Sequence, residues 1–135
     1  MRTIGRRTAF LALACATIAV GLAVHLGGAA LGTVARDVLG DALWAMMIFW
    51  GAGVLVPHAR LAIRCICAYA ACVIVEVSQL YHTPTLNAVR ATTLGHLVLG
   101  SGFDPRDLMS YAAGVALAAL LEWIIVRRRM HPAAT

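Results

Sequence analysis

Charged residues are scarce in this chain of 135 residues, where Asp, Glu, Lys and Arg together make up 13% of the sequence. Hydrophobic residues make up 61%, and the mean hydropathy is +0.84. So apolar a composition argues against a soluble domain. It indicates an integral membrane protein, in which runs of about 20 apolar residues cross the bilayer as helices.

Lysine is absent, and all 11 basic residues are arginine, against six acidic residues. Most of the surplus lies at the two ends of the chain, at Arg2, Arg6 and Arg7 and again at residues 127–129. Basic clusters directly beside apolar helices usually act as topology signals and lipid-headgroup contacts. We therefore expect membrane lipids and no nucleic acid as partners.

Several kinds of functional motif are also missing. The four cysteines lie in apolar runs, where cysteine behaves as a small hydrophobic residue, and Cys65 and Cys67 would point to different faces of a helix. His82, His96 and Asp104 lack the spacing of metal ligands on a helix. No phosphate-binding loop, dinucleotide fingerprint or Ser-His-Asp pattern stands out. We therefore expect no metal, no cofactor and no catalytic residues.

Four apolar runs predict membrane spans, at about residues 9–31, 42–57, 61–81 and 108–126. The first run resembles a signal peptide but is longer than a signal sequence requires, so we expect it to be retained as a span. The predicted fold is an all-α integral membrane protein with a single membrane domain, 1–135. It is a four-transmembrane-helix bundle with an extended external connection, 82–107, between the third and fourth helices.

The distribution of arginine predicts the topology. The short second connection is basic, with His58 and Arg60, and Arg64 just after it could extend back to the headgroups. By the positive-inside rule, we expect both termini and this connection to be cytoplasmic, which in a bacterium places the protein in the inner membrane. The connection 82–107 is then external, and within it residues 94–100 are too short to cross, so they lie in the interface or re-enter partway.

Glu76 is the most informative residue, because it follows the apolar run 70–75. A carboxylate inside a membrane helix is costly, about 2.5–3.5 kcal/mol at the centre, and usually faces a bundle interior with a partner. Helical spacing places Tyr69, Cys72, Glu76 and Gln79 on one face. We expect Arg90 to be the counter-charge, after Pro84 has ended the helix.

The candidate binding cluster combines this face with polar residues of the external connection and the fourth span. Its members are Glu76, Gln79, Asn87, Arg90, Asp107 and Tyr111. Two interpretations stay open: a structural clasp between the third and fourth spans, or a binding or proton-handling site. Glu122, near the basic C-terminus, is interpreted as an interfacial charge.

Four segments carry a resemblance to a known family. The chain resembles the domain-of-unknown-function family 2809 in GDALWA (Gly40 to Ala45), EVSQLY (Glu76 to Tyr81), LNAVRATTLGHLVLGSGF (Leu86 to Phe103) and DLMSYAAG (Asp107 to Gly114). The resemblance implies a small bacterial membrane protein with no activity attached.

A more distant pattern, E-x-x-Q followed by Arg, Asp and Gly, is similar to the VanZ-like proteins, whose name refers to glycopeptide (teicoplanin) resistance. It would map onto Glu76, Gln79, Arg90, Asp107 and Gly114. VanZ-like proteins usually carry Asn shortly before the final Gly, whereas this chain has Tyr111.

These observations favour a protein that binds an envelope lipid or an anionic headgroup through the external cluster, without catalysis. The possible partners include a lipid-linked envelope component. The alternatives are a membrane-embedded catalyst or proton-coupled carrier that uses Glu76, and a structural accessory subunit of a membrane complex. Small residues between Ala112 and Ala119 would permit close helix packing within the chain or in a homo-oligomer.

Overall fold

The computed structural model describes residues 3–27, 31–100 and 102–130, and confirms an all-helical fold over these residues. The helices are α1 (Thr3–Gly27), α2 (Thr33–Leu55), α3 (Leu61–Ser78), α4 (Pro84–Arg90), α5 (Thr93–Leu99) and α6 (Pro105–Met130). Over the described part of the chain, four of them contain segments long and apolar enough to cross a membrane: Gly5–Gly27, Thr33–Leu55, Leu61–Ser78 and Pro105–Ile125.

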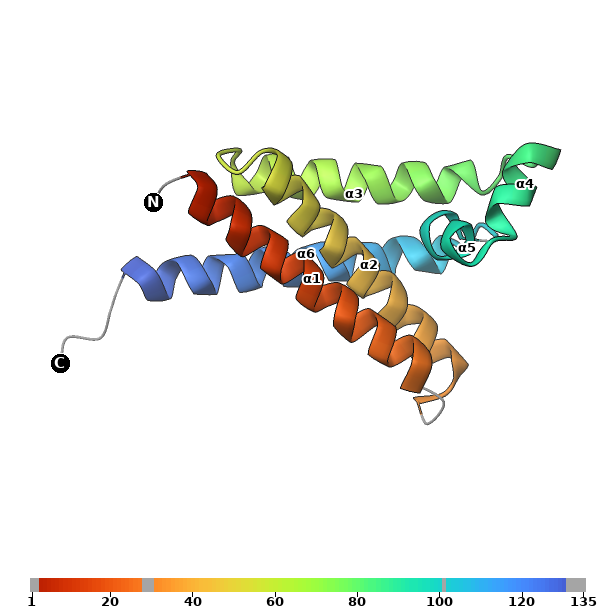
Figure 1. The fold of residues 1–135 in the computed structure, drawn as a ribbon, viewed down its shortest axis with the longest axis horizontal. Helices are drawn as coiled ribbons and strands as arrows, with labels where there is room; N and C mark the ends of the chain where they lie inside the picture. The colour runs from red at the N-terminus through yellow and green to blue at the C-terminus, as the bar shows by residue number, and fades with distance from the viewer. Residues whose placement is uncertain (1–2, 28–30, 101, 131–135) are drawn as a thin grey trace.

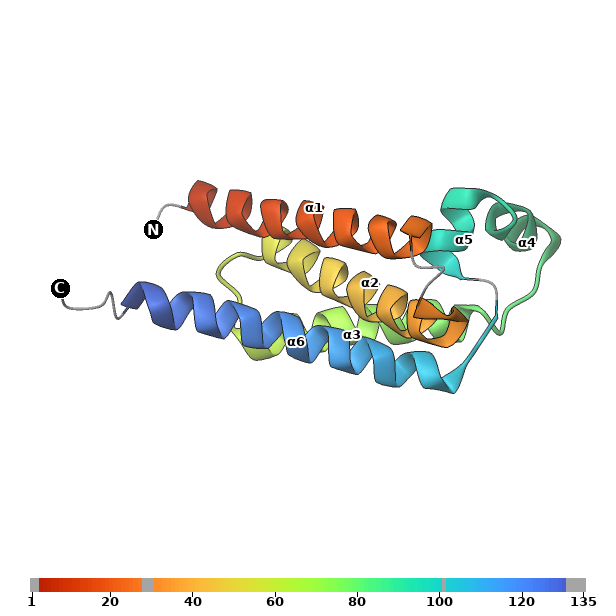
Figure 2. The same cartoon turned by 90° about the horizontal axis from the view of Figure 1, so that it is seen from below.

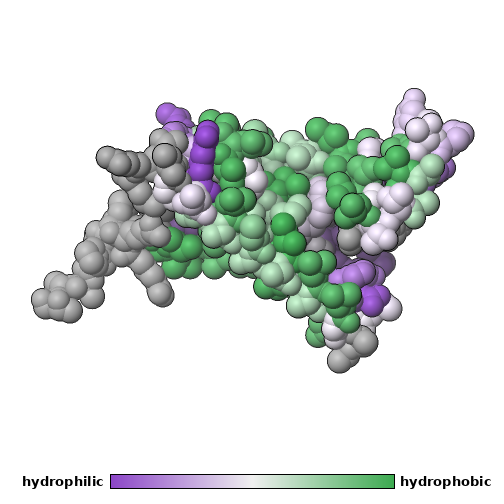
Figure 3. All heavy atoms as spheres, in the orientation of Figure 1, coloured by the Kyte–Doolittle hydropathy of each residue, from purple (hydrophilic) through white to green (hydrophobic). Residues whose placement is uncertain are grey.

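The outside of the bundle is apolar, as expected of a surface in contact with lipid. Large hydrophobic side chains such as Leu26, Ile66, Ile74 and Met109 are more than two-thirds exposed. Hydrophobic residues cover the middle of the face shown in Figure 3, and the most hydrophilic atoms lie towards its two ends. This pattern supports a multi-pass membrane protein.

Helix α2 is the central helix of the bundle. It packs against α1, α3 and α6, whereas the backbone of α1 lies close to that of α2 and not to those of the other described helices. Figure 2 shows α2 between α1 on one side and α3 and α6 on the other. The core around α2 includes the fully buried Ala45, Phe49, Ala68, Cys72 and Ala118.

The connections between the helices lie at two opposite ends of the bundle (Figures 1 and 2). The start of α1, the α2–α3 connection and the end of α6 lie at one end, which we call the termini end. The end of α1, the start of α2, and α4 and α5 lie at the other, which we call the α4/α5 end. Four spans arranged in this way leave both termini on the same side of a membrane.

Two expectations need correction. Helix α2 begins at Thr33, so the polar residues 33–41 are helical instead of forming a connection. The long connection between α3 and α6 is largely folded into α4 and α5. Helix α4 begins where the sequence favours it, because Thr83 Oγ1 accepts a hydrogen bond from the Leu86 N–H at 3.2 Å and Pro84 occupies the first turn.

A glycine brings α6 directly onto α2. A Cβ added at Gly114 would lie 2.2 Å from the Ala42 carbonyl oxygen, so the two backbones are in contact there. Such close approach is the usual role of small residues between membrane helices. It places the beginning of α6 beside the beginning of α2, at the α4/α5 end.

Candidate functional site

Glu76 lies at the centre of a polar cluster near the α4/α5 end, and its side chain is fully buried. Its Oε2 atom accepts hydrogen bonds from Gln79 Nε2 at 2.9 Å and from the Tyr111 hydroxyl at 3.0 Å. Its Oε1 atom accepts a third from the Asp104 backbone N–H at 2.8 Å. Glu76 thus joins α3, α6 and the segment that precedes α6, and three donors satisfy it without a cation.

The neighbouring Gln79 has one amide atom without a partner. Its nitrogen must face Glu76, because a carboxylate accepts and does not donate. Its Oε1 atom is then buried and accepts no hydrogen bond from the described residues. Gly100, with a φ of +64°, lies so close that an added Cβ would be 2.5 Å from Gln79 Nε2, and the amide is therefore fixed between Glu76 and Gly100.

Two further carboxyl groups complete the cluster, one each from α2 and α6. The Asp107 side chain lies within hydrogen-bonding range of the Asp41 side chain, and both are close enough to Glu76 to interact with it electrostatically. Both aspartates are partly exposed, unlike Glu76. We call Asp41, Glu76, Gln79, Asp107 and Tyr111 the acceptor cluster.

The expected pairing of Glu76 with Arg90 is wrong. Arg90 is buried on α4, but its guanidinium donates to the backbone carbonyls of Ser78 at 2.7 Å and Tyr81 at 2.8 Å. Ser78 is the last residue of α3 and Tyr81 lies just beyond it. Carbonyls at the end of a helix lack the N–H of a following turn, and a basic side chain can hydrogen-bond to them. Arg90 therefore caps α3, and no ion pair joins a described arginine to the acceptor cluster.

The structure thus brings together four of the six residues of the predicted cluster: Glu76, Gln79, Asp107 and Tyr111. Arg90 serves the end of α3, and Asn87 is exposed on α4. Sequence reasoning missed Asp41, which it assigned to a connection outside the membrane. The available signal was the GDALWA segment, in which Asp41 directly precedes the apolar face of α2.

A second polar centre lies towards the termini end and was also missed. Arg64 of α3 forms a buried ion pair with Glu122 of α6, and its guanidinium lies 4.8 Å from the centroid of the Phe10 ring. Arg64 is 1% exposed, so it does not extend to the headgroups as expected. Glu122 is likewise a buried partner and not an interfacial charge.

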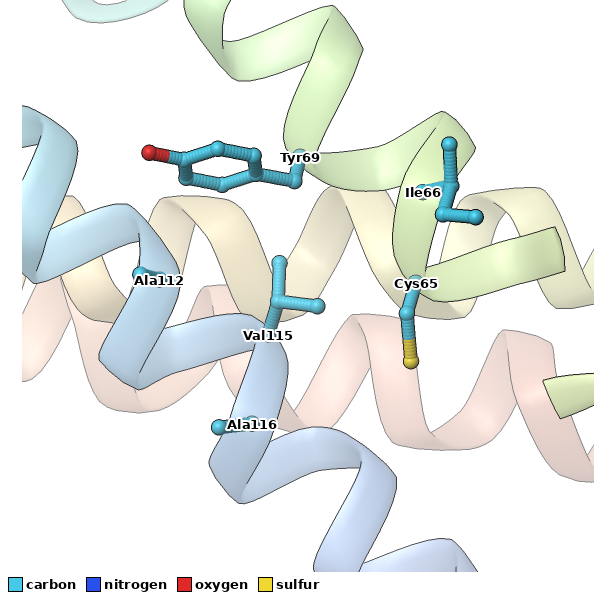
Figure 4. Close-up of a pocket in the computed structure, with 6 residues that line it drawn as sticks. All are labelled: Cys65, Ile66, Tyr69, Ala112, Val115 and Ala116. Carbon is cyan, nitrogen blue, oxygen red and sulfur yellow. The ribbon is translucent and has the colours of Figure 1, made fainter. Parts of the chain in front are cut away.

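An apolar groove runs between α3 and α6, next to the acceptor cluster along both helices. Its volume is about 370 Å³, and its lining residues are Cys65, Ile66, Tyr69, Ala112, Val115 and Ala116. Figure 4 shows the Tyr69 ring reaching from α3 towards α6, above Val115. Of the small residues expected to permit close packing, Gly114 and Ala118 are buried within the bundle, whereas Ala112 and Ala116 line the groove.

The chemistry of the cluster is that of hydrogen-bond acceptors. It contains three carboxyl groups and an amide oxygen with no partner among the described residues, against two donors, the Gln79 amide nitrogen and the Tyr111 hydroxyl, which both already donate to Glu76. No group of three or more His, Cys, Asp or Glu side chains within the described residues could hold a metal ion. Of the three residues weighed and rejected as metal ligands, His96 has a side chain outside the described ones.

The fold and the site together define a small multi-helix membrane protein with a buried carboxyl cluster near one end of its bundle. The chain belongs to the family described as "Protein of unknown function (DUF2809)", whose model matches residues 30–115, well over half of the sequence. The resemblance carried by the four sequence segments is thereby confirmed. No solved structure matches the chain. The matched region includes the whole acceptor cluster.

Proposed function

We propose that the protein binds a lipid of the bacterial envelope at the α4/α5 end of its bundle and does not catalyse a reaction. The observation that carries this proposal is the position of an apolar groove beside a polar cluster on the same two helices, α3 and α6. A ligand that fills both must be polar at one end and apolar along its length. Membrane lipids have this form.

The spacing along the helices suits such a ligand. Tyr69, in the groove, precedes Glu76 by two helical turns, or about 10 Å, and Ala112 follows Asp107 by about 8 Å, at 1.5 Å per residue. The groove volume of about 370 Å³ lies within the usual range of ligand pockets, about 300–1,000 Å³. The groove extends over little more than one turn of each helix, which suits an acyl chain better than a second helix.

The state of Glu76 supports binding over catalysis or proton transport. A proton carrier must be reached by its proton donor and acceptor, whereas Glu76 is fully buried and already accepts three hydrogen bonds. Its proposed role is to hold α3 against α6, so that Asp41 and Asp107 stay in place. These two partly exposed aspartates would contact the ligand.

The similarity to VanZ-like proteins fits a role in the envelope. Of the residues in that pattern, Glu76, Gln79 and Asp107 lie in the cluster, Gly114 brings α6 onto α2, and Arg90 caps α3. Because Arg90 is used for the cap, an anionic headgroup is the less suitable ligand. We propose that the shared pattern builds a polar end to the bundle and that the lipid in question belongs to the envelope.

We further propose that the protein lies in the bacterial inner membrane with its termini end in the cytoplasm. Seven of the 11 arginines follow the positive-inside rule in that orientation: Arg2, Arg6, Arg7, Arg60, Arg127, Arg128 and Arg129. Reporter fusions after Arg60 and after the C-terminus should then read cytoplasmic, and one near Thr93 external. An external C-terminus would reject this orientation.

Native mass spectrometry tests the lipid proposal. The protein, extracted from its own membranes in a mild detergent, should carry one lipid per chain of a class enriched over the bulk extract. Replacing Asp41 and Asp107 with Asn should abolish the enrichment. Asp37→Asn, at an exposed acid one turn earlier on α2 that interacts with both aspartates only through its charge, should preserve most of it. A lipid profile equal to that of the bulk membrane would overturn the proposal, and the same spectra report whether the protein is a homo-oligomer.

A further inference from the structure

We propose that α5 is an interfacial helix, whose exposed face inserts among the lipids of the leaflet at the α4/α5 end. This placement concerns the bulk lipid around the bundle, so it does not depend on the bound lipid proposed above. Of the two positions that the sequence leaves open for residues 94–100, the structure favours the interface over re-entry into the membrane.

The exposed face of α5 is apolar. Leu94 and Val98 are 76% and 52% exposed, and residues four apart lie on the same face of a helix. The helix contains no Asp, Glu, Lys or Arg. On another side α5 packs against α4, because a Cβ added at Gly95 would overlap the Val89 carbonyl group. Figure 3 shows hydrophobic atoms over α5 and more hydrophilic ones over α4, where Asn87 is exposed.

The length of α3 gives the depth of α5. At 1.5 Å per residue, the 18 residues of α3 extend about 27 Å, slightly less than the roughly 30 Å thickness of the hydrocarbon core. With the basic α2–α3 connection at the opposite boundary, the end of α3 lies at or just within this one. Helix α5 packs against α3, and Gly100, directly after α5, lies against Gln79, directly after α3. Helix α5 is thus held at the level of the hydrocarbon boundary.

Exposed residues near the end of α3 support the same level. Tyr81, three residues beyond α3, is 69% exposed, and tyrosine is enriched at membrane–water interfaces because its ring is apolar and its hydroxyl polar. Leu80 is 61% exposed beside it, and Ile74, one turn before the end of α3, is 69% exposed. Because α5 packs against α3, its apolar face extends the lipid-facing surface of the spans.

The ends of α5 argue against a deeper position. A helix leaves its first four N–H groups and its last four carbonyl groups without helical partners, and α5 has only seven residues. The Gly95 N–H donates to the Thr92 hydroxyl at 3.0 Å, which satisfies one of these groups. Hydrocarbon offers no partner to the others, whereas headgroups and interfacial water do. The apolar face and the unsatisfied ends are therefore both accommodated at the interface.

Site-directed spin labelling of the full-length protein in phosphatidylcholine vesicles measures the depth of α5. The accessible cysteines, Cys15, Cys65 and Cys67, are first replaced by alanine. Cys72 is kept, because it is fully buried and does not react with the label in the folded protein. A thermal unfolding midpoint close to that of the unmodified protein confirms that each labelled variant is folded.

Single cysteines for the label are then introduced at Leu94 and Val98. The matched controls carry the label at Asn87, exposed on α4, and at Ile66, which is 68% exposed near the middle of α3. Collisions of the label with oxygen, which concentrates in hydrocarbon, are compared with collisions with a water-soluble nickel chelate. We expect the oxygen-to-nickel ratio at Leu94 and Val98 to be several-fold higher than at Asn87 and lower than at Ile66.

Three results would overturn the inference. A ratio equal to that at Asn87 would place the α5 face in water, where it is available to a protein partner. A ratio equal to that at Ile66 would show that α5 re-enters the hydrocarbon core. Low collision rates with both reagents would show that another protein chain covers the face. The native mass spectra that test the bound lipid are independent of these outcomes, so the two proposals fail separately.

Discussion

The buried ion pair between Arg64 and Glu122 gives the sharpest test of the structure. Glu122→Leu removes the carboxylate and leaves the Arg64 guanidinium in a site that is 1% exposed. Arg64 then keeps only the rings of Phe10 and Phe49, whose centroids lie 4.8 Å and 5.5 Å from its central carbon. A guanidinium stays charged in proteins, so it cannot escape by losing a proton.

The expected magnitudes follow from this asymmetry. Breaking a buried ion pair typically lowers the free energy of unfolding by about 3–5 kcal/mol, and we expect Glu122→Leu to fall in that range. Arg64→Met should lower the free energy of unfolding by less, because the Glu122 carboxyl group left behind can take up a proton and become neutral. The double variant should be close to neutral, since apolar side chains of similar volume often replace a buried pair without loss.

Equilibrium unfolding in mixed micelles, followed by tryptophan fluorescence, measures all three variants. The matched control is Arg60→Met, at an exposed arginine just before α3, which should change stability by no more than about 0.5 kcal/mol. The refuting result is additivity. If the double variant loses as much stability as the two single variants combined, Arg64 and Glu122 do not interact.

Three further predictions concern the α4/α5 end. Gly114→Ala should destabilise the protein by about 1–3 kcal/mol, because its Cβ would meet the Ala42 carbonyl oxygen at 2.2 Å; thermal unfolding in detergent measures the loss, and an unchanged midpoint would contradict the α2–α6 contact. Tyr111→Phe removes one of the three donors to Glu76 and should cost about 1–3 kcal/mol in the same assay, while a larger loss of lipid than of stability would assign Tyr111 a direct role in binding. Arg90→Ala should destabilise the protein through loss of the cap on α3, and Glu76→Gln should not rescue it; recovery in the double variant would show that the two residues are partners after all.

The sequence was sufficient to predict which segments form helices long and apolar enough to cross a membrane, and which face of α3 is buried. Hydropathy gave four spans, and the four-residue spacing from Cys72 to Glu76 placed these two residues on one face, as the structure confirms. The same spacing continues back through Ala68 to Arg64. Extending the face by two turns would have identified Arg64 as buried, so this error came from incomplete use of the pattern and not from missing information.

The partners of the buried groups could not be derived in the same way. Each contact in the two polar centres depends on how far one helix is displaced along another, and the periodicity of a single helix does not determine that displacement. Arg90 was the first arginine after Glu76 in the sequence, but the backbone carbonyls of Ser78 and Tyr81 accept its hydrogen bonds instead. Asp41 was assigned to a connection because local polarity cannot distinguish a loop from the first turns of a helix that meets other polar groups.

Three charged residues on the second and third spans interact with the last span or with the segment before it. Asp41 meets Asp107, Glu76 meets Tyr111 and the Asp104 N–H, and Arg64 meets Glu122. The chain is synthesised from its N-terminus, so these groups lack their partners on α6 until α6 itself has been synthesised. Insertion of α6 is therefore the step that commits the protein to its final assembly, and a nascent chain that stops before it would present three unsatisfied sites to the quality-control proteases of the membrane.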